Sequence, residues 1–217
     1  MRTVTHIVLI LILGVGIGLA IRAINRPSPP APSTRVVYSN DQGELEPEAV
    51  PDSAPAMAPE GWMSEFELTE RSGETVTSEE LKGTPYVVSF FFSTCPSICI
   101  LQNQKVQELQ LMFEDQGIRF VSISVDPQTD DPATLREYAA RFDADDDQWL
   151  FMTGDLDYIR RVGAEVFRLA VDEKFHTEKF VLVGKQGEII GYYTWTEKRQ
   201  YEQLKTDIRK LLDEKKS

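Results

Sequence analysis

The chain has 217 residues, enough for one domain of ordinary size with an appendage and too few for two large domains. Its formal charge of -12 argues against a nucleic-acid partner, because binding of phosphate groups needs a net basic surface or a clear Lys/Arg patch, and the sequence has neither. Only two cysteines occur, too few for a disulfide scaffold, so the pair indicates a site.

Residues 1–26 predict a membrane anchor. An uncharged apolar stretch over residues 7–21 stops at Arg22. Counted from Val4 it has about 18 residues, which is marginal for a span of about 20 and within reach of a long signal-peptide core. We expect an uncleaved anchor, because no small-x-small cleavage motif follows the apolar run. The positive charges on its two sides do not decide its orientation.

Residues 27–60 are rich in Pro, Ala, Ser and Glu and contain only scattered apolar side chains. Such a segment cannot bury a core, so it predicts a flexible or polyproline-like linker. The globular domain is expected over residues 61–217, without internal repeats.

The domain begins with two short strand-like segments around Ser72 and Gly73, which predict a hairpin. Residues 86–92 then form a continuous apolar run, typical of a strand buried on both faces, that leads into Cys95. A helix is predicted to follow Cys95, because apolar residues recur at helical spacing over residues 98–112, and to end by Gly117.

Strands and helices alternate through the rest of the chain. Strands are predicted over residues 118–125, 149–152, 179–183 and 188–195, and helices over residues 132–142, 155–166 and 197–213. This order, which ends in a hairpin and a helix, predicts an α/β sheet with helices on both faces.

The cysteine pair lies where a buried strand turns into a helix. This context places Cys95 at the helix N-terminus, where free amides and the helix dipole favour the thiolate, and Pro96 fits the first helical turn. Cys99 is expected one turn later on the same face, so the two sulfurs can bind one ligand or each other. Two thiolates suit a soft ion, Cu(I) above all, whereas structural zinc usually requires four ligands. The alternative is that both cysteines pack as small apolar residues.

His176 is the one histidine inside the domain, because His6 precedes the apolar segment. It lies a few residues before the strand predicted over residues 179–183, on the loop that lies beside the cysteine turn in a thioredoxin-like topology. A neutral imidazole there would complete a Cys2His site that copper accepts. The alternative is an ordinary histidine on a surface loop.

The domain resembles the Sco/SenC family of copper chaperones for cytochrome c oxidase assembly, which implies a thioredoxin-like fold. Four segments carry the resemblance: residues 91–99 as the cysteine turn, residues 124–127 with Asp130 and Pro132, residues 149–154, and residues 175–193 as the histidine segment. The metal ligands that the resemblance implies are Cys95, Cys99 and His176.

Two positions beside the cysteines depart from the family pattern. Ser97 replaces an acidic residue and Ile100 replaces a proline. Loss of the carboxylate removes a negative charge that favours a bound cation and raises thiol pKa values, so metal affinity and redox balance are expected to differ. Asp126 resembles an aspartate near the family's site, although an Asp-Pro turn explains it equally well.

The resemblance implies delivery of copper to the dinuclear copper centre of oxidase subunit II. It also implies a membrane-anchored domain outside the cytoplasm, in the periplasm or an equivalent space, where the cysteines can cycle between dithiol and disulfide. Other periplasmic copper carriers and thiol reductases are further expected partners. The alternative function is a thiol-disulfide oxidoreductase that reduces the cysteines of that centre, with Cys95 as the attacking thiol. A peroxide-reducing enzyme is a third alternative, but Phe92 occupies the position of its usual threonine.

Overall fold

The computed structural model describes residues 62–213. The predicted anchor (1–26) and linker (27–60) lie outside the described residues and stay predictions. Within residues 62–213, no helix has the length and apolar character needed to cross a membrane.

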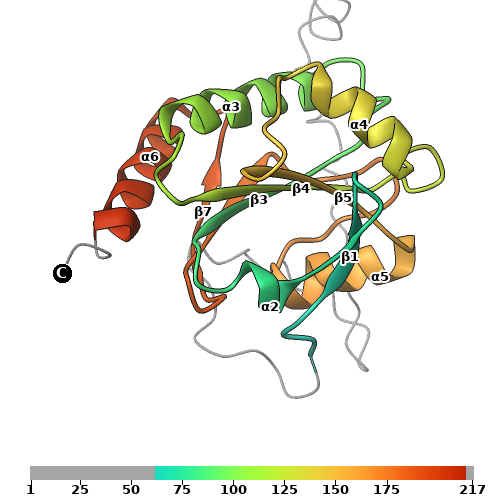
Figure 1. Ribbon diagram of the computed structural model, residues 1–217, viewed down its shortest axis with the longest axis horizontal. Coiled ribbons are helices and arrows are strands. Elements are labelled where there is room, and N and C mark those ends of the chain that lie inside the picture. The colour runs from blue at the N-terminus through green and yellow to red at the C-terminus, as the bar shows by residue number, and fades with distance from the viewer. Residues whose placement is uncertain (1–61, 214–217) are drawn as a thin grey trace, which may run out of the picture. The chain divides into compact units, whose positions relative to one another are not determined.

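A seven-stranded sheet in the order β2-β1-β5-β4-β3-β6-β7 forms the centre of the domain (Figure 1). Its strands are β1 (Glu67–Glu70), β2 (Thr75–Thr77), β3 (Tyr86–Phe91), β4 (Arg119–Ser124), β5 (Trp149–Thr153), β6 (Lys179–Val183) and β7 (Ile189–Thr194). Strands β3, β4 and β5 are parallel, and the remaining pairings are antiparallel. The predicted N-terminal hairpin and closing hairpin are therefore confirmed.

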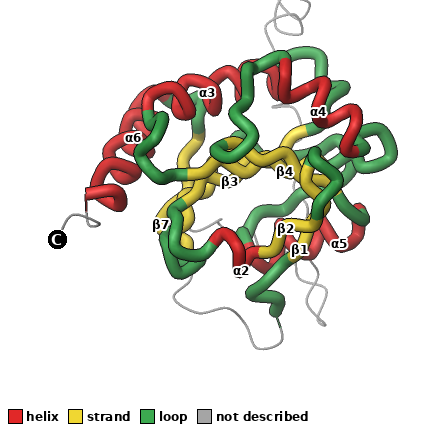
Figure 2. Tube along the Cα trace, in the orientation of Figure 1, coloured by secondary structure: helices red, strands yellow, loops and turns green. Residues whose placement is uncertain are grey.

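Helices cover both faces of the sheet, as predicted (Figures 1 and 2). They are α2 (Ser78–Leu81), α3 (Ile98–Met112), α4 (Pro132–Ala140), α5 (Leu156–Arg161) and α6 (Lys198–Asp213). Helices α3, α4 and α6 pack on one face, and α2 and α5 pack on the other. Helix α5 continues into a π-helical turn, η1 (Val162–Val166).

The alternation of side chains along β3 explains its continuous apolar sequence. Val87 and Phe91 pack against α3, α4 and α6, whereas Val88 and Phe90 pack against the opposite helices. Every residue of β3 is buried, so the strand has no solvent-facing side on which polar residues would alternate with apolar ones. Burial of each large apolar side chain contributes about 1.5–3 kcal/mol, which makes the strand a fixed base for the segment that follows it.

The start of α3 differs from the prediction. The helix begins at Ile98, and Pro96 lies in a bend before it, so Cys95 does not share a helical face with Cys99. The backbone N–H of Cys95 instead donates to the Phe92 carbonyl at 3.2 Å. A residue that precedes proline is disfavoured in the helical region, which explains why the helix cannot include Cys95.

Candidate metal centre

The cysteine turn connects the carboxyl end of β3 to the start of α3. Cys95 is 6% exposed and Cys99 is fully buried, and both are free thiols. The backbone N–H of Cys99 donates to the Cys95 sulfur at 3.4 Å. Cys95 therefore lies at the helix N-terminus, as predicted, although the chain reaches that place through a bend.

Strand pairing brings His176 to this turn across 77 positions of sequence. Strand β6 runs antiparallel to β3, with Val88 opposite Val181, so the residues before β6 lie beside those that follow β3. The His176 Nε2 atom lies 3.0 Å from the Cys99 Sγ atom. The structure thus places the predicted histidine against one of the two predicted cysteines.

The orientation of the His176 ring follows from its second nitrogen. Nδ1 lies 3.2 Å from the carbonyl oxygen of Thr177, and a carbonyl only accepts hydrogen bonds. A proton on Nδ1 satisfies this contact and leaves the Nε2 lone pair directed at Cys99, as metal ligation by Nε2 requires. The Phe92 ring meets the imidazole edge to face, with centroids 6.0 Å apart.

The two thiols differ in acidity. Burial, the largest single influence, opposes ionisation of Cys95, but hydrogen bonds from the amides of residues 97–99 and from the Cys99 thiol outweigh it and lower the pKa of Cys95. Burial raises the pKa of Cys99 to about 12, with a smaller contribution from Cys95. The site therefore holds one thiol that ionises readily and one that holds its proton.

Burial also lowers the pKa of His176, against the opposing effect of the Thr177 carbonyl. The imidazole is thus neutral near pH 7, the form that binds metals. Two thiols and a neutral imidazole are donors that fit a soft ion such as copper. Within residues 62–213, however, no three His, Cys, Asp or Glu side chains already converge as a metal-binding group.

Asp126 lies beside the segment that carries His176. Its side chain is buried, and its Oδ2 atom lies 3.5 Å from the Lys174 Nζ atom without a hydrogen bond. The Lys174 backbone N–H donates to the Val125 carbonyl at 3.3 Å. Asp126 thus contacts the loop before His176, and its carbonyl also accepts from the backbone of the turn that follows it, so both sequence-based interpretations describe part of its environment.

Asp130 lies in one of the four segments that resemble the Sco/SenC family, but the sequence does not indicate a role for it. In the structure it is fully buried and accepts hydrogen bonds from Ser93 and Ser124. Ser93 belongs to the cysteine turn, so Asp130 links this turn to the end of β4. Its position six residues after β4 does not indicate this contact, because burial of a loop carboxylate depends on the packing of three separate segments.

Comparison with known proteins gives this geometry a context. The family model described as SCO1/SenC matches residues 55–213, which include the whole sheet and all three predicted ligands. The chain belongs to the SCO1/SenC family. A SCO1 protein homolog of Bacillus subtilis is 30% identical to it over 153 residues, which are 66% of this chain and 79% of the relative.

Two solved structures of Sco proteins are similar to this SCO1/SenC domain. BsSco, a member of the Sco family of cytochrome c oxidase assembly proteins in which a disulfide switch was identified, is 27% identical and has a TM-score of 0.63 over 69% of this chain and 92% of its own. ScoI of Bradyrhizobium japonicum with copper bound is 26% identical, with a TM-score of 0.59 over 70% and 99% of the two chains. These matches confirm the expected Sco-type thioredoxin-like fold.

The two departures from the SCO1/SenC pattern lie on different sides of the turn. Ser97 is exposed and precedes α3 without a side-chain capping bond. Ile100 is half-buried and packs against the apolar cluster under α3. The structure therefore assigns Ile100 a packing contact and leaves Ser97 at the surface beside the cysteines.

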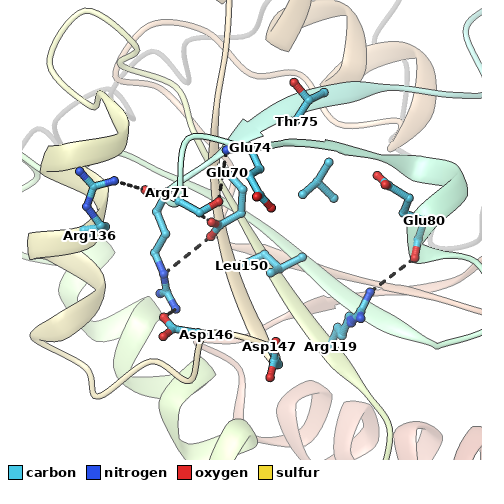
Figure 3. A pocket seen from close by; sticks show the side chains of 12 residues that line it. Glu70, Arg71, Glu74, Thr75, Glu80, Arg119, Arg136, Asp146, Asp147 and Leu150 are labelled. Carbon is cyan, nitrogen blue, oxygen red and sulfur yellow. Dashed lines mark hydrogen bonds and ion pairs between the residues drawn. The ribbon is translucent and has the colours of Figure 1, made fainter.

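A separate cavity of about 640 Å³ lies away from the cysteines (Figure 3). Arg71 reaches there between Glu70 and Asp146, and Arg136 donates to the Arg71 carbonyl at 2.5 Å. Arg119, the first residue of β4, also lines it. The cysteines follow the carboxyl end of β3, which is parallel to β4. The cavity therefore lies at the opposite end of these strands from the cysteines, and no predicted ligand lines it.

Proposed function

We propose that this protein is a metallochaperone that binds copper through Cys95, Cys99 and His176 and delivers it to the dinuclear copper centre of cytochrome c oxidase subunit II. The contact of 3.0 Å between Cys99 Sγ and His176 Nε2 carries the proposal, because it joins a thiol and an imidazole from opposite halves of the domain. The copper-bound relative from Bradyrhizobium japonicum supports copper as the metal.

The different pKa values of the two thiols and the imidazole suit a metal ion that is bound and later released. Copper binding displaces thiol protons, so the readily ionised Cys95 provides the first sulfur ligand, and the metal must compete with the proton on Cys99. The neutral His176 ring offers Nε2 without losing a proton. Incoming thiolates of an acceptor protein can then replace these ligands one at a time.

The cellular setting is part of the same proposal. Residues 1–26 anchor the chain, and the domain lies on the extracytoplasmic side, the periplasm in a bacterium. The apolar sequence of residues 7–21 supports the anchor, and the two redox-competent thiols suit an oxidising compartment. Subunit II and other periplasmic copper carriers or thiol reductases are the proposed partners.

The difference in thiol acidity favours a second candidate, a thiol-disulfide oxidoreductase. The Cys95 thiolate would attack a disulfide of subunit II, and Cys99 would then displace the mixed disulfide. The acceptor gains two electrons and two protons as its dithiol, and this chain is left with a Cys95 to Cys99 disulfide. The disulfide switch of BsSco supports this redox capability.

Replacement of His176 separates the two functions, since both need the sulfurs and only copper binding needs the imidazole. The gene for this protein is replaced in cells by one that encodes the His176→Ala variant. If the protein is a copper chaperone, these cells should lack copper-loaded oxidase. If it is a reductase, they should still assemble the oxidase. The copper content and activity of the oxidase provide the measurement. His6→Ala is the matched control, because it removes the other histidine of the chain. Normal oxidase assembly with His176→Ala would contradict the chaperone proposal.

A further inference from the structure

Asp130 is an unusual group in the loop between β4 and α4. Its carboxylate is fully buried, and its side-chain hydrogen bonds within residues 62–213 come from two serines. Oδ2 accepts from the Ser93 backbone N–H at 3.0 Å and from the Ser124 hydroxyl at 2.5 Å. The Ser93 hydroxyl donates to Oδ1.

These contacts join two neighbouring strand ends. Ser124 is the last residue of β4, and Ser93 lies two residues after β3 and two residues before Cys95. The turn from Phe92 to Cys95 has one backbone hydrogen bond of its own, from the Cys95 N–H to the Phe92 carbonyl. Asp130 therefore adds the side-chain contacts that fix the start of the cysteine turn to the sheet.

We propose that Asp130 is a positioning residue that holds the cysteine turn, through Ser93, in the dithiol arrangement that receives copper. This inference deepens the proposed function and rests on it for the identity of the metal. Two sulfur atoms that are already held in place lose less conformational freedom when copper binds both of them. Loss of the Asp130 contacts should therefore weaken copper binding. A disulfide fixes its two sulfurs covalently and depends less on the same contacts.

The charge of Asp130 acts on the site separately from its hydrogen bonds. Its carboxylate is one of the smaller influences that raise the pKa of Cys99, because a negative charge disfavours a second one on the nearby sulfur. Asp130→Asn therefore alters a positioning contact and also removes a negative charge near the sulfurs. Ser93→Ala removes the hydroxyl contact alone and leaves the charge in place, so the two variants together separate position from charge.

The test uses the full-length chain and two measurements. Cu(I) affinity is measured by competition with a chelator of known affinity, and the reduction potential of the cysteine pair is measured against dithiothreitol. We expect Ser93→Ala and Asp130→Asn each to weaken Cu(I) binding by about tenfold. We also expect the equilibrium between dithiol and disulfide to shift toward the disulfide by about tenfold. This shift makes the reduction potential of the cysteine pair more negative by about 30 mV.

Two nearby substitutions are matched controls. Asp131→Asn alters the adjacent aspartate, which caps α4, and Ser122→Ala removes a buried hydroxyl from the same strand as Ser124. Both should leave Cu(I) affinity and the potential unchanged. Should Asp130→Asn fail to fold, Ser93→Ala still decides.

A change of Cu(I) affinity in Asp130→Asn with no change in Ser93→Ala would show that Asp130 acts through charge and would overturn the proposal. Equal shifts in the control variants would also overturn it, since any loss of stability would then suffice. Failure of the wild-type chain to bind copper would contradict the proposed function instead, and the reduction potential would still test the positioning role.

Discussion

At the residue scale, the two cysteines have different environments although they are four positions apart. Cys95 accepts amide hydrogen bonds at the start of α3, which offset its burial and lower its pKa. Cys99 is fully buried beneath it and retains its proton, with a pKa raised to about 12. The pair therefore contains one nucleophilic sulfur and one that becomes a ligand or a resolving thiol after the first has reacted.

This difference predicts selective alkylation of the reduced, metal-free chain. Iodoacetamide should label Cys95 well before Cys99 near pH 7, because the thiolate is the reactive form. Since the pKa of Cys95 is lowered, its labelling should persist below the pH at which an ordinary thiol stops reacting, and fall away only below its own pKa. Mass mapping of labelled peptides over a pH series gives the measurement. Faster labelling of Cys99 would contradict the assigned acidities.

The residues of the candidate site could be found in the sequence, and their surroundings could not. A cysteine pair after a buried strand and a histidine before a later strand are visible as residue types in order. The contacts of Asp130 depend on how the loops at the ends of β3 and β4 meet, which leaves no local pattern. The same holds for the ion pair between Asp126 and Lys174.

At the scale of elements, Gln102 connects α3 to the sheet below the metal site. Its side chain is fully buried, and Nε2 donates to the Phe90 carbonyl at 2.8 Å. Oε1 accepts from the indole N–H of Trp195, which follows β7, at 3.1 Å. One polar side chain thus satisfies groups from two strands and fixes the register of the helix that carries Cys99.

Replacement of Gln102 by leucine should destabilise the domain by about 2 kcal/mol or more. The apolar side chain leaves the Phe90 carbonyl and the Trp195 indole N–H buried without partners, and each such group costs about 1–3 kcal/mol. Urea denaturation measures the change in the free energy of unfolding. Gln104→Leu, an exposed position on the same helix, is the control and should change stability little. Equal effects at both positions would contradict the role of Gln102.

The sequence predicted most elements because their apolar patterns are long, but it missed short ones and misplaced one boundary. Helix α2 has four residues and no room for a helical period, although Thr77 and Glu80 form the capping box that announces it. The start of α3 was placed too early, at Pro96. A π-helical turn such as η1 has no recognised sequence signature, so residues 155–166 appeared as one helix.

At the scale of the whole molecule, the metal site depends on the topology of the sheet. The antiparallel pairing of β6 with β3 brings His176 to the cysteines. Alternating strands and helices predicted the sheet, and the resemblance to the Sco/SenC family implied a thioredoxin-like fold, in which the loop before β6 lies beside the cysteine turn. Composition and periodicity alone do not distinguish this order from other α/β sheets with helices on both faces.

If the two thiols are the copper ligands proposed above, copper binding is coupled to the redox state of the protein. Oxidation should form an intramolecular Cys95 to Cys99 disulfide and release the metal, because a disulfide sulfur is a poor ligand. The 3.4 Å contact between the Cys95 sulfur and the Cys99 amide places the two residues close enough for this bond. Copper content after oxidation, with the disulfide verified by mass spectrometry, measures the coupling. Full retention of copper by the verified disulfide form would exclude it.

We propose one soft-metal site in this chain, with Cys95 and Cys99 as its sulfur ligands. Titration of the reduced full-length chain with copper, followed by metal analysis after removal of unbound ion, tests it most directly. We expect one copper per chain for the wild type and no stoichiometric copper for the Cys95→Ala/Cys99→Ala double variant. One tightly bound copper per chain in the double variant would contradict the account.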